Sequence, residues 1–220
     1  MSSIQVKICG LTVPEEAKAC AEAGANAIGL IFYPPSPRFV NLEQASLVRQ
    51  AIPDGVTTVG VFVDLPVENI ILTAREVGFH TIQLHGNETS RTIWILKNAG
   101  FRVIKVLRSV GEHLLFESAE YALADAILVE ASKGELPGGN GASWNWSEAQ
   151  KLSTVRPFIL AGGLNTSNIT DALQQSGASA IDLSSGVEVS PGRKNIHSVQ
   201  TILKAAHDFV PAPSTGVIFP

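Results

Sequence analysis

Short apolar runs alternate with longer amphipathic segments along most of the chain. The short runs are rich in valine and isoleucine and have strand length, and the segments between them space their apolar residues along one helix face. The expected strands are eight runs, at residues 4–9, 26–32, 57–63, 80–85, 101–107, 125–130, 157–162 and 179–185. The clearest helical segments are 13–24, 41–52, 66–78, 165–177 and 194–209, with a shorter one at 145–153. Strands that alternate with helices are expected to run parallel, with helices outside the sheet.

Eight such units, each of roughly 20–30 residues, predict a closed (β/α)8 TIM barrel. We expect a single α/β domain over residues 1–210, followed by a loose tail at 211–220 with little role in the core. An open doubly wound sheet is the alternative fold. It usually needs fewer strands, and it carries a G-x-G-x-x-G motif after the first strand, where this chain has GLTVPE.

Helix ends are marked by three residues. Asn41 is expected to cap the helix that follows it, and Gly24 and Gly78 are expected to end theirs.

Composition narrows the class of protein. The 220 residues are 45% hydrophobic and 16% charged, with a formal net charge of −4. No cluster of lysine and arginine indicates nucleic acid, and no apolar run approaches the ~20 residues of a membrane span. Cys9 and Cys20, the only cysteines, make neither a disulfide framework nor a metal-ligand spacing. Together with the absence of a signal peptide, this predicts a soluble cytoplasmic protein, either a monomer or a homodimer.

Alternation along the strands separates two faces. Apolar residues such as Val6 and Ile8 should face the helices, which turns Gln5, Lys7 and Cys9 towards the barrel axis. The same reasoning turns these polar residues inward near the C-terminal ends of their strands: Lys7, Cys9, Gln83, His85, Glu130, Asp182 and Ser184. Active sites of this fold lie at that end.

Each of these residues alone could be structural, since a small cysteine at a strand end is more often packing. Their clustering favours a site. Lys7 needs a buried partner, and Asp182 on the strand across the closure is the candidate. Asp125, at the opposite end of its strand, is interpreted as structural.

Two glycine-bearing turns follow the seventh and eighth strands, AGGLNTSN at 161–168 and SSGVEVSPG at 184–192. Loops in these positions often bind phosphate, because glycine lets backbone N–H groups approach the anion. The candidate phosphate ligands are Gly162, Gly163, Asn165, Ser184, Ser185 and Gly186. A third cluster, PGGNGASW at 137–144, could extend this cradle or form a flap, and both readings stay open. A small phosphorylated ligand is expected.

Six motifs, in this order and spacing, resemble phosphoribosylanthranilate isomerase of tryptophan biosynthesis: KICGLT, FYPPSPRFV, VGVFVD, QLHG, LAGGLN and DLSSGVEVSPGRKN. The resemblance extends over residues 4–205. It implies a (β/α)8 barrel that performs an Amadori rearrangement of N-(5-phosphoribosyl)anthranilate to 1-(2-carboxyphenylamino)-1-deoxyribulose 5-phosphate, without metal or organic cofactor. It also implies that Cys9 is the general base, that Glu130 is the general acid, and that Arg38 binds the anthranilate carboxylate.

This chemistry sets electrostatic expectations. Cys9 must be partly thiolate, so Lys7 is expected to lower its pKa. Glu130 must be protonated when it acts, so its pocket is expected to raise its pKa. Arg38 can hold a carboxylate in a bidentate manner. Lys7, Arg38, Gln83, His85 and Asp182 are the expected substrate-binding residues.

The chain departs from the family at several positions. Where this chain has Glu130, the family usually has Asp. It usually has Lys or Arg in place of Ala142, and Asp in place of both Asn145 and Asn195. Two alternatives to the isomerase therefore stay open: a paralogous phosphosugar-amine enzyme on the same scaffold, and a non-catalytic phosphate-binding barrel.

Overall fold

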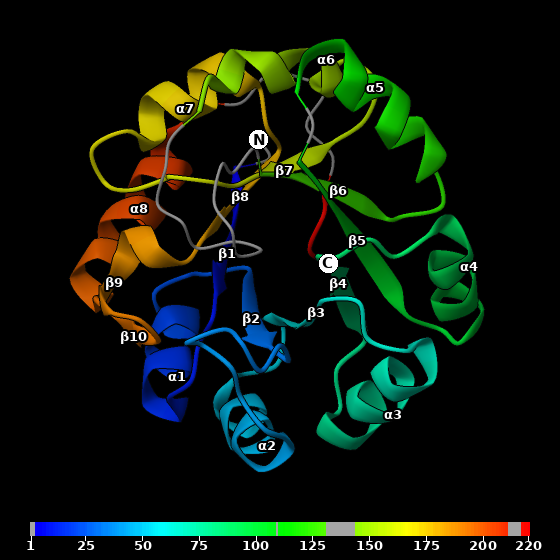
Figure 1. The fold of residues 1–220 in the computed structure, drawn as a ribbon. Coiled ribbons are helices and arrows are strands. Elements are labelled where there is room, and N and C mark those ends of the chain that lie inside the picture. The colour runs from blue at the N-terminus through cyan, green and yellow to red at the C-terminus, as the bar shows by residue number, and fades with distance from the viewer. Residues whose placement is uncertain (1–2, 109, 131–143, 211–216) are drawn as a thin grey trace.

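Eight parallel strands form a closed barrel (Figure 1). The computed structural model describes residues 3–108, 110–130, 144–210 and 217–220. The strands are β1 (Gln5–Cys9), β2 (Ala27–Ile31), β3 (Thr57–Phe62), β4 (Thr81–Leu84), β5 (Arg102–Leu107), β6 (Ala126–Val129), β7 (Phe158–Leu160) and β8 (Ala180–Leu183). The barrel closes where β1 pairs with β8, which sets Lys7 opposite Asp182. The predicted (β/α)8 fold is confirmed.

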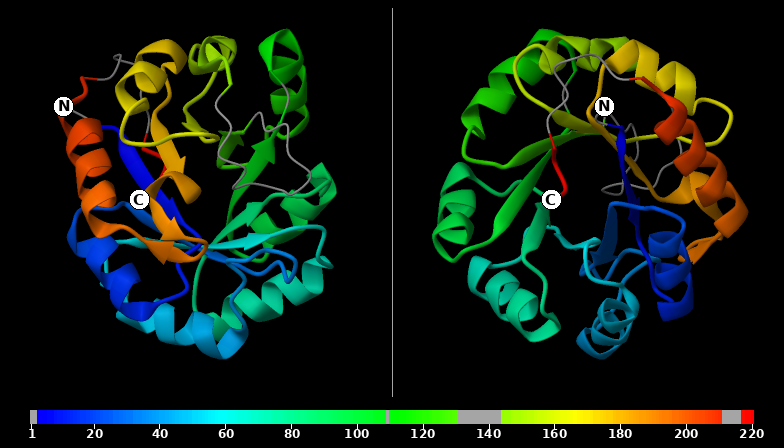
Figure 2. Two further views of the ribbon diagram at one scale, coloured as in Figure 1. Left: turned by 60° about the vertical axis from the view of Figure 1, so that its left-hand side comes forward. Right: turned by 180° about the vertical axis from the view of Figure 1, so that it is seen from behind.

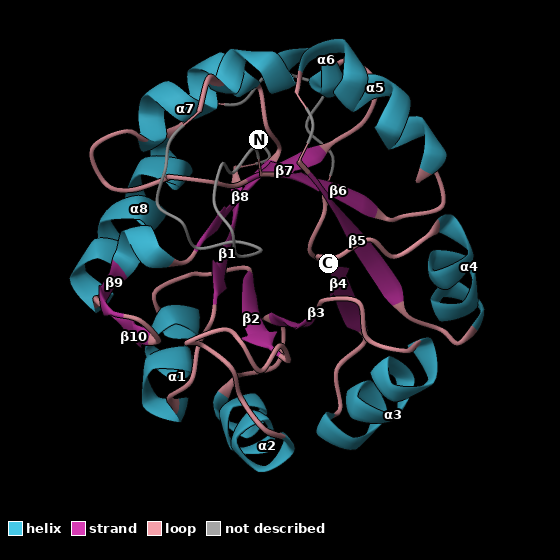
Figure 3. Cartoon of the chain, viewed as in Figure 1, coloured by secondary structure: helices cyan, strands magenta, loops and turns pink. Residues whose placement is uncertain are grey.

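Helices surround the ring of strands (Figure 3). They are α1 (Pro14–Glu22), α2 (Leu42–Ala51), α3 (Val67–Val77), α4 (Ser90–Asn98), α5 (Gly111–Glu120), α6 (Gln150–Ser153), α7 (Ile169–Ser176) and α8 (Ile196–Asp208), with the 3-10 turns η1 (Trp146–Ala149) and η2 (Ser185–Val187). The side chain of Asn41 accepts a hydrogen bond from Gln44 N and caps α2, as expected. Gly78 ends α3 with φ 81°, and Gly24 follows the last residues of α1 with φ 109°.

Apolar side chains pack in two layers. Alternate strand residues such as Val6 and Ile8 face the helices and belong to a large outer cluster. The intervening residues face the barrel axis, where Val59, Ile104 and Ile159 belong to a smaller inner cluster. The expected alternation of faces is therefore correct, and it directs the polar inward residues to one opening.

Two of the last four residues enter the barrel instead of trailing from it. Ile218 and Phe219 are each 4% exposed and belong to the inner cluster. Seen from behind, the red end of the chain lies inside the ring of strands (Figure 2, right). The expectation of a loose tail with little role in the core is wrong for Ile218 and Phe219. Burial of their apolar side chains lowers the free energy of the folded protein.

The connection between β8 and α8 carries a short hairpin, β9 (Glu188–Ser190) and β10 (Arg193–Lys194), which follows η2. This hairpin brings two charged residues, Glu188 and Lys194, towards the C-terminal ends of the strands. Most of the third glycine cluster, residues 137–143, lies outside the described residues. None of the helices in the described ranges has the length and apolar character needed to cross a membrane.

Candidate active site

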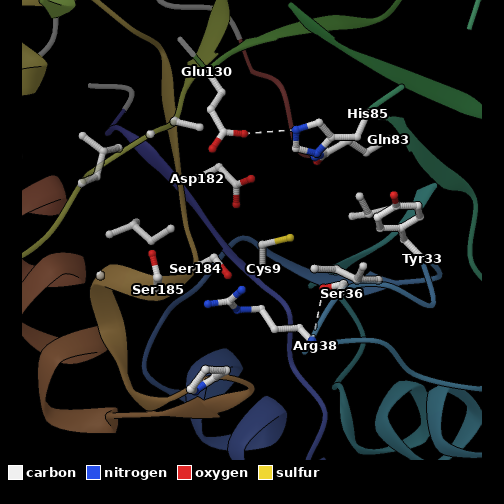
Figure 4. Close-up of a pocket in the computed structure, with 18 of the residues that line it drawn as sticks. Cys9, Tyr33, Ser36, Arg38, Gln83, His85, Glu130, Asp182, Ser184 and Ser185 are labelled. Carbon is white, nitrogen blue, oxygen red and sulfur yellow. Dashed lines mark hydrogen bonds and ion pairs between the residues drawn. The ribbon is translucent and has the colours of Figure 1, made fainter. Parts of the chain in front are cut away.

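A cavity of about 230 Å³ opens at the C-terminal ends of the strands. Cys9 enters it from β1 and Glu130 from the residue after β6, so the two predicted catalytic groups share one opening (Figure 4). Residues from most of the other strands and loops complete the wall, among them Arg38, Gln83, His85, Asp182 and Ser184. The polar residues that the sequence singled out are therefore brought together.

Lys7 lies below the cavity and is fully buried. Its Nζ lies 2.9 Å from Oδ2 of Asp182, which confirms the predicted partner. Burial lowers the pKa of Lys7, but the charges of Asp182 and Cys9 outweigh burial, and the net pKa is raised. The pKa of Asp182 is also raised, because burial outweighs the charge of Lys7. Lys7 supports the site from beneath and does not line it.

Cys9 is 6% exposed, and its thiol packs over Gly29 of β2. A Cβ atom at position 29 would lie 2.7 Å from Cys9 Sγ and 3.1 Å from Lys7 Nζ, so only glycine fits beneath these groups. Burial raises the pKa of the thiol, and Lys7 offsets burial only in part. Lys7 therefore acts to lower the pKa of Cys9, as expected, but desolvation is the larger effect and the net pKa is raised.

Glu130 pairs with His85 across the cavity. His85 Nε2 lies 3.1 Å from Glu130 Oε2, an ion-pair distance without the alignment of a full hydrogen bond (Figure 4). The amide nitrogen of Gln83 lies 3.5 Å from His85 Nδ1, and a donor there favours the tautomer whose proton is on Nε2. Gln83 on β4, His85 directly after β4 and Glu130 directly after β6 therefore form one chain of polar side chains.

The pKa of Glu130 is shifted in the opposite direction to the one expected. Burial raises it, but the contact with His85 and the charges of His85, Arg108 and Lys7 outweigh burial, so the net pKa is lowered. The sequence indicated a buried carboxyl but not that His85 would face it. The net shift therefore favours the ionised carboxylate, so a general acid at this position would have to gain a proton before it acts.

Arg38 is bound by a residue that the sequence analysis did not single out. Its Nε and Nη2 donate to the carboxylate of Glu188 at 2.9 and 2.7 Å, and Lys194 Nζ lies 2.6 Å from the same carboxylate. Burial raises the pKa of Glu188, but both cations outweigh burial and lower it. The signal was present in GVEVSPGRK, where three charged residues, Glu188, Arg193 and Lys194, follow the serine-rich turn.

The two glycine turns form one side of the cavity. Gly162 and Gly163 have φ 91° and 70°, a region that favours glycine. Gly186 packs against the backbone of Leu164, so a side chain at 186 would collide with the neighbouring turn. Five of the six predicted phosphate ligands, all except Asn165, line the cavity.

Asn165 does not line the cavity. Its Oδ1 accepts hydrogen bonds from the backbone N–H and hydroxyl of Ser167, at 2.9 and 2.6 Å. The side chain therefore closes its own turn, a local bond that asparagine forms readily. The location of Asn165 outside the cavity does not support the prediction that it binds phosphate.

Unpartnered polar atoms concentrate in the cavity. Among the described residues, six buried side-chain atoms lack a hydrogen-bond partner, and four of them belong to cavity residues: Gln83 Oε1, His85 Nε2, Asp182 Oδ1 and Ser184 Oγ. Buried polar groups are usually satisfied, so this clustering indicates a polar ligand. Over the described ranges, no three His, Cys, Asp or Glu side chains are grouped to hold a metal ion. Asp125, as expected, lies elsewhere and accepts a hydrogen bond from Val103 N.

Comparison with known sequences agrees with this geometry. Residues 6–205 match the family model described as N-(5'-phosphoribosyl)anthranilate isomerase. The chain is 42% identical to the enzyme of that name from Desulfatibacillum aliphaticivorans, over 93% of each chain. It is 39% identical to one from Cereibacter sphaeroides, over 94% of this chain and all of the other.

Solved structures give the same picture. The phosphoribosyl anthranilate isomerase of Thermotoga maritima superposes with a TM-score of 0.85 at 33% identity, over 92% of this chain and 98% of that one. Another structure of such an isomerase, in complex with reduced 1-(o-carboxyphenylamino)-1-deoxyribulose 5-phosphate, superposes with a TM-score of 0.82 at 32% identity, with the same coverage.

Proposed function

The chain belongs to the N-(5'-phosphoribosyl)anthranilate isomerase family of tryptophan biosynthesis, and we propose that Cys9 and Glu130 carry out its Amadori rearrangement as general base and general acid. The observation that carries this assignment is that the thiol and the carboxyl, from β1 and β6, line the same cavity. The isomerisation needs an acid and a base on different sides of one ribose ring, and these two groups supply them.

The first step opens the furanose ring. A proton from Glu130 goes to the ring oxygen, the C1′–O bond breaks, and the aryl nitrogen forms a Schiff base with C1′. His85, 3.1 Å from Glu130, is the neighbour through which the carboxyl can be protonated.

The second step moves a proton from C2′. The Cys9 thiolate removes that proton, electrons move towards the iminium nitrogen, and the resulting enolamine tautomerises to the ketone. Three cations, on Lys7, Arg38 and Lys194, lie near enough to Cys9 to interact with its negative charge. They favour the thiolate, although burial opposes it.

Arg38 is proposed to bind the substrate carboxylate, and the turns at Gly162–Gly163 and Ser184–Gly186 to bind the phosphate. These groups line one cavity together with Cys9 and Glu130. A substrate held there by its two anionic ends would have its ribose against the acid and the base. Gln83 and Asp182 have unpartnered oxygens that can accept hydrogen bonds from the sugar hydroxyls.

Turnover of phosphoribosylanthranilate by the purified protein and four variants tests this assignment. Cys9→Ala and Glu130→Ala are expected to abolish detectable activity, whereas Glu130→Asp retains or improves it. Cys20→Ala is the matched control, because Cys20 is buried in α1 and does not line the cavity. An active Glu130→Ala variant would show that another group is the acid. Binding without turnover by the parent protein would instead favour a non-catalytic phosphate-binding barrel.

A further inference from the structure

The end of the barrel opposite the cavity, which we call the floor, is incompletely filled by its own strands. Three strands present only alanine to the inner cluster there: Ala27, Ala126 and Ala180. Barrels of this fold usually fill their interior with layers of bulky branched side chains. Alanine side chains do not reach the axis, so the floor would be hollow without a further contribution.

Ile218 and Phe219 provide that contribution. Both pack in the inner cluster with the three alanines, and each is 4% exposed. Val217, directly before them, is 71% exposed. The chain therefore enters the barrel only with this pair of large side chains.

The backbone of the segment is bound as closely as its side chains. Gln5 Oε1 accepts hydrogen bonds from the N–H groups of Ile218 and Phe219, at 2.6 and 3.0 Å, and Gln5 Nε2 donates to Phe219 O at 2.6 Å. Arg102 Nη2 donates to Ile218 O at 3.0 Å, and Thr57 Oγ1 donates to Pro220 O at 3.3 Å. Side chains from β1, β3 and β5 thus satisfy consecutive peptide groups, as a peptide-binding site does.

We propose that the floor of the barrel is a peptide-binding site whose ligand is the chain's own segment 217–220. The ligand class is a short apolar peptide with two adjacent large side chains. The family match ends at residue 205, so the segment lies beyond the matched part of the chain. Tethering keeps the site occupied, because a short tether gives an effective concentration in the millimolar range.

Occupancy of the floor also bears on the layer above it. Gln5 lies two residues before Lys7 on the same face of β1, and Lys7 is fully buried with Asp182. A filled floor keeps water from reaching that ion pair from below, and a buried pair interacts more strongly without water. The segment therefore acts as a seal as well as a ligand.

A chain that ends at residue 216 tests the proposal. Its thermal midpoint is expected to fall by roughly 20 °C, the effect of losing both a buried Phe and a buried Ile in a domain of this size. Acetylated Val-Ile-Phe-Pro at about 5 mM, above the effective concentration of the tether, should recover at least half of that shift. A peptide of the same composition in the order Ile-Pro-Val-Phe should not. A midpoint within about 2 °C of the parent, or equal effects of the two peptides, would overturn the proposal.

Two variants of the full chain decide the matter if the shortened chain does not fold. Phe219→Ala should lower the midpoint by roughly 10 °C. Val217→Ala, the matched control at an exposed position, should leave it within about 2 °C of the parent. Equal midpoints for Phe219→Ala and the parent would show that the segment is not bound.

Discussion

Glu188 holds Arg38 through two atoms of the guanidinium, Nε and Nη2, at 2.9 and 2.7 Å. Of the five N–H groups of the guanidinium, this pairing leaves free both on Nη1 and one on Nη2. That open edge can still hold a carboxylate in a two-pronged manner. Under the proposed function, the ion pair orients Arg38 for the substrate carboxylate instead of competing with it.

Replacing Glu188 by Gln is expected to raise KM about tenfold and to change kcat less. The variant keeps the shape but removes the charge that fixes Arg38 and neutralises Lys194. Loss of one partner of a buried ion pair should also lower the free energy of unfolding by about 3 kcal/mol. Steady-state kinetics and denaturant titration measure both effects. Glu112→Gln, which breaks an exposed pair with Lys151, is the control and should cost under about 1 kcal/mol. Similar losses in the two variants would argue against a role for Glu188 in orienting Arg38.

The pH profile of kcat/KM should be broad and flat around neutrality. The pKa of Glu130 is lowered and that of Cys9 is raised, so the active form, with Glu130 protonated and Cys9 ionised, is a minor species. Its population rises with pH below the pKa of Glu130, stays constant between the two values, and falls above the pKa of Cys9. The acid limb thus reports the carboxyl and the alkaline limb the thiol. Rates measured from about pH 3 to about pH 11 would show both limbs, and a narrow peak would contradict the prediction.

His85→Asn should move only the acid limb of that profile. Removing the imidazole removes the leading influence that lowers the pKa of Glu130, so this pKa should rise and the limb should move to higher pH. The alkaline limb, set by Cys9, should stay in place. Loss of activity with an unshifted acid limb would assign His85 to substrate binding rather than to the protonation of Glu130.

Gly29→Ala should lower kcat about 100-fold. The added methyl would lie 2.7 Å from Cys9 Sγ and displace the thiol, and a shift of about 1 Å near the reacting atoms costs about that factor. Thermal stability should fall as well. The double variant Gly29→Ala/Cys9→Ala should recover part of the stability but no activity, because it removes the contact together with the base. If the double variant recovers no stability, the strain does not come from the contact between the added methyl and Cys9.

Ser184→Ala and Asn165→Ala should distinguish a turn residue that contacts the ligand from one that only stabilises its own turn. Ser184 has an unpartnered hydroxyl in the cavity, so its loss should raise KM about tenfold through a missing hydrogen bond to the anion. Asn165 bonds within its own turn, so its loss should lower stability with a smaller effect on KM. The reverse order of KM values would restore Asn165 as a phosphate ligand.

The sequence predicted what depends on strand periodicity. Alternation along β1 and β8 was enough to pair Lys7 with Asp182, since inward residues at equal depth on adjacent strands must meet. The same argument gathered Cys9, His85 and Glu130 at one opening. These predictions succeeded because the backbone alone determines which way such residues face.

Loop contacts and net electrostatics could not be predicted in this way. Glu188 meets Arg38 across 150 residues of sequence, because the hairpin after β8 contacts the loop between β2 and α2, which carries Arg38. The pKa of Glu130 depends on which neighbours outweigh its burial, which periodicity does not reveal. The Ile218–Phe219 pair is too short to show a period, so its burial depends on a hollow that only the assembled strands create.

The buried end of the chain also matters for protein engineering. Pro220 is exposed, although Phe219 before it is buried. A fusion partner or affinity tag added after Pro220 would therefore leave the barrel at the end opposite the cavity. Substrate would enter unhindered. The appended polypeptide would, however, pull directly on two core residues, which favours a long flexible spacer at that junction.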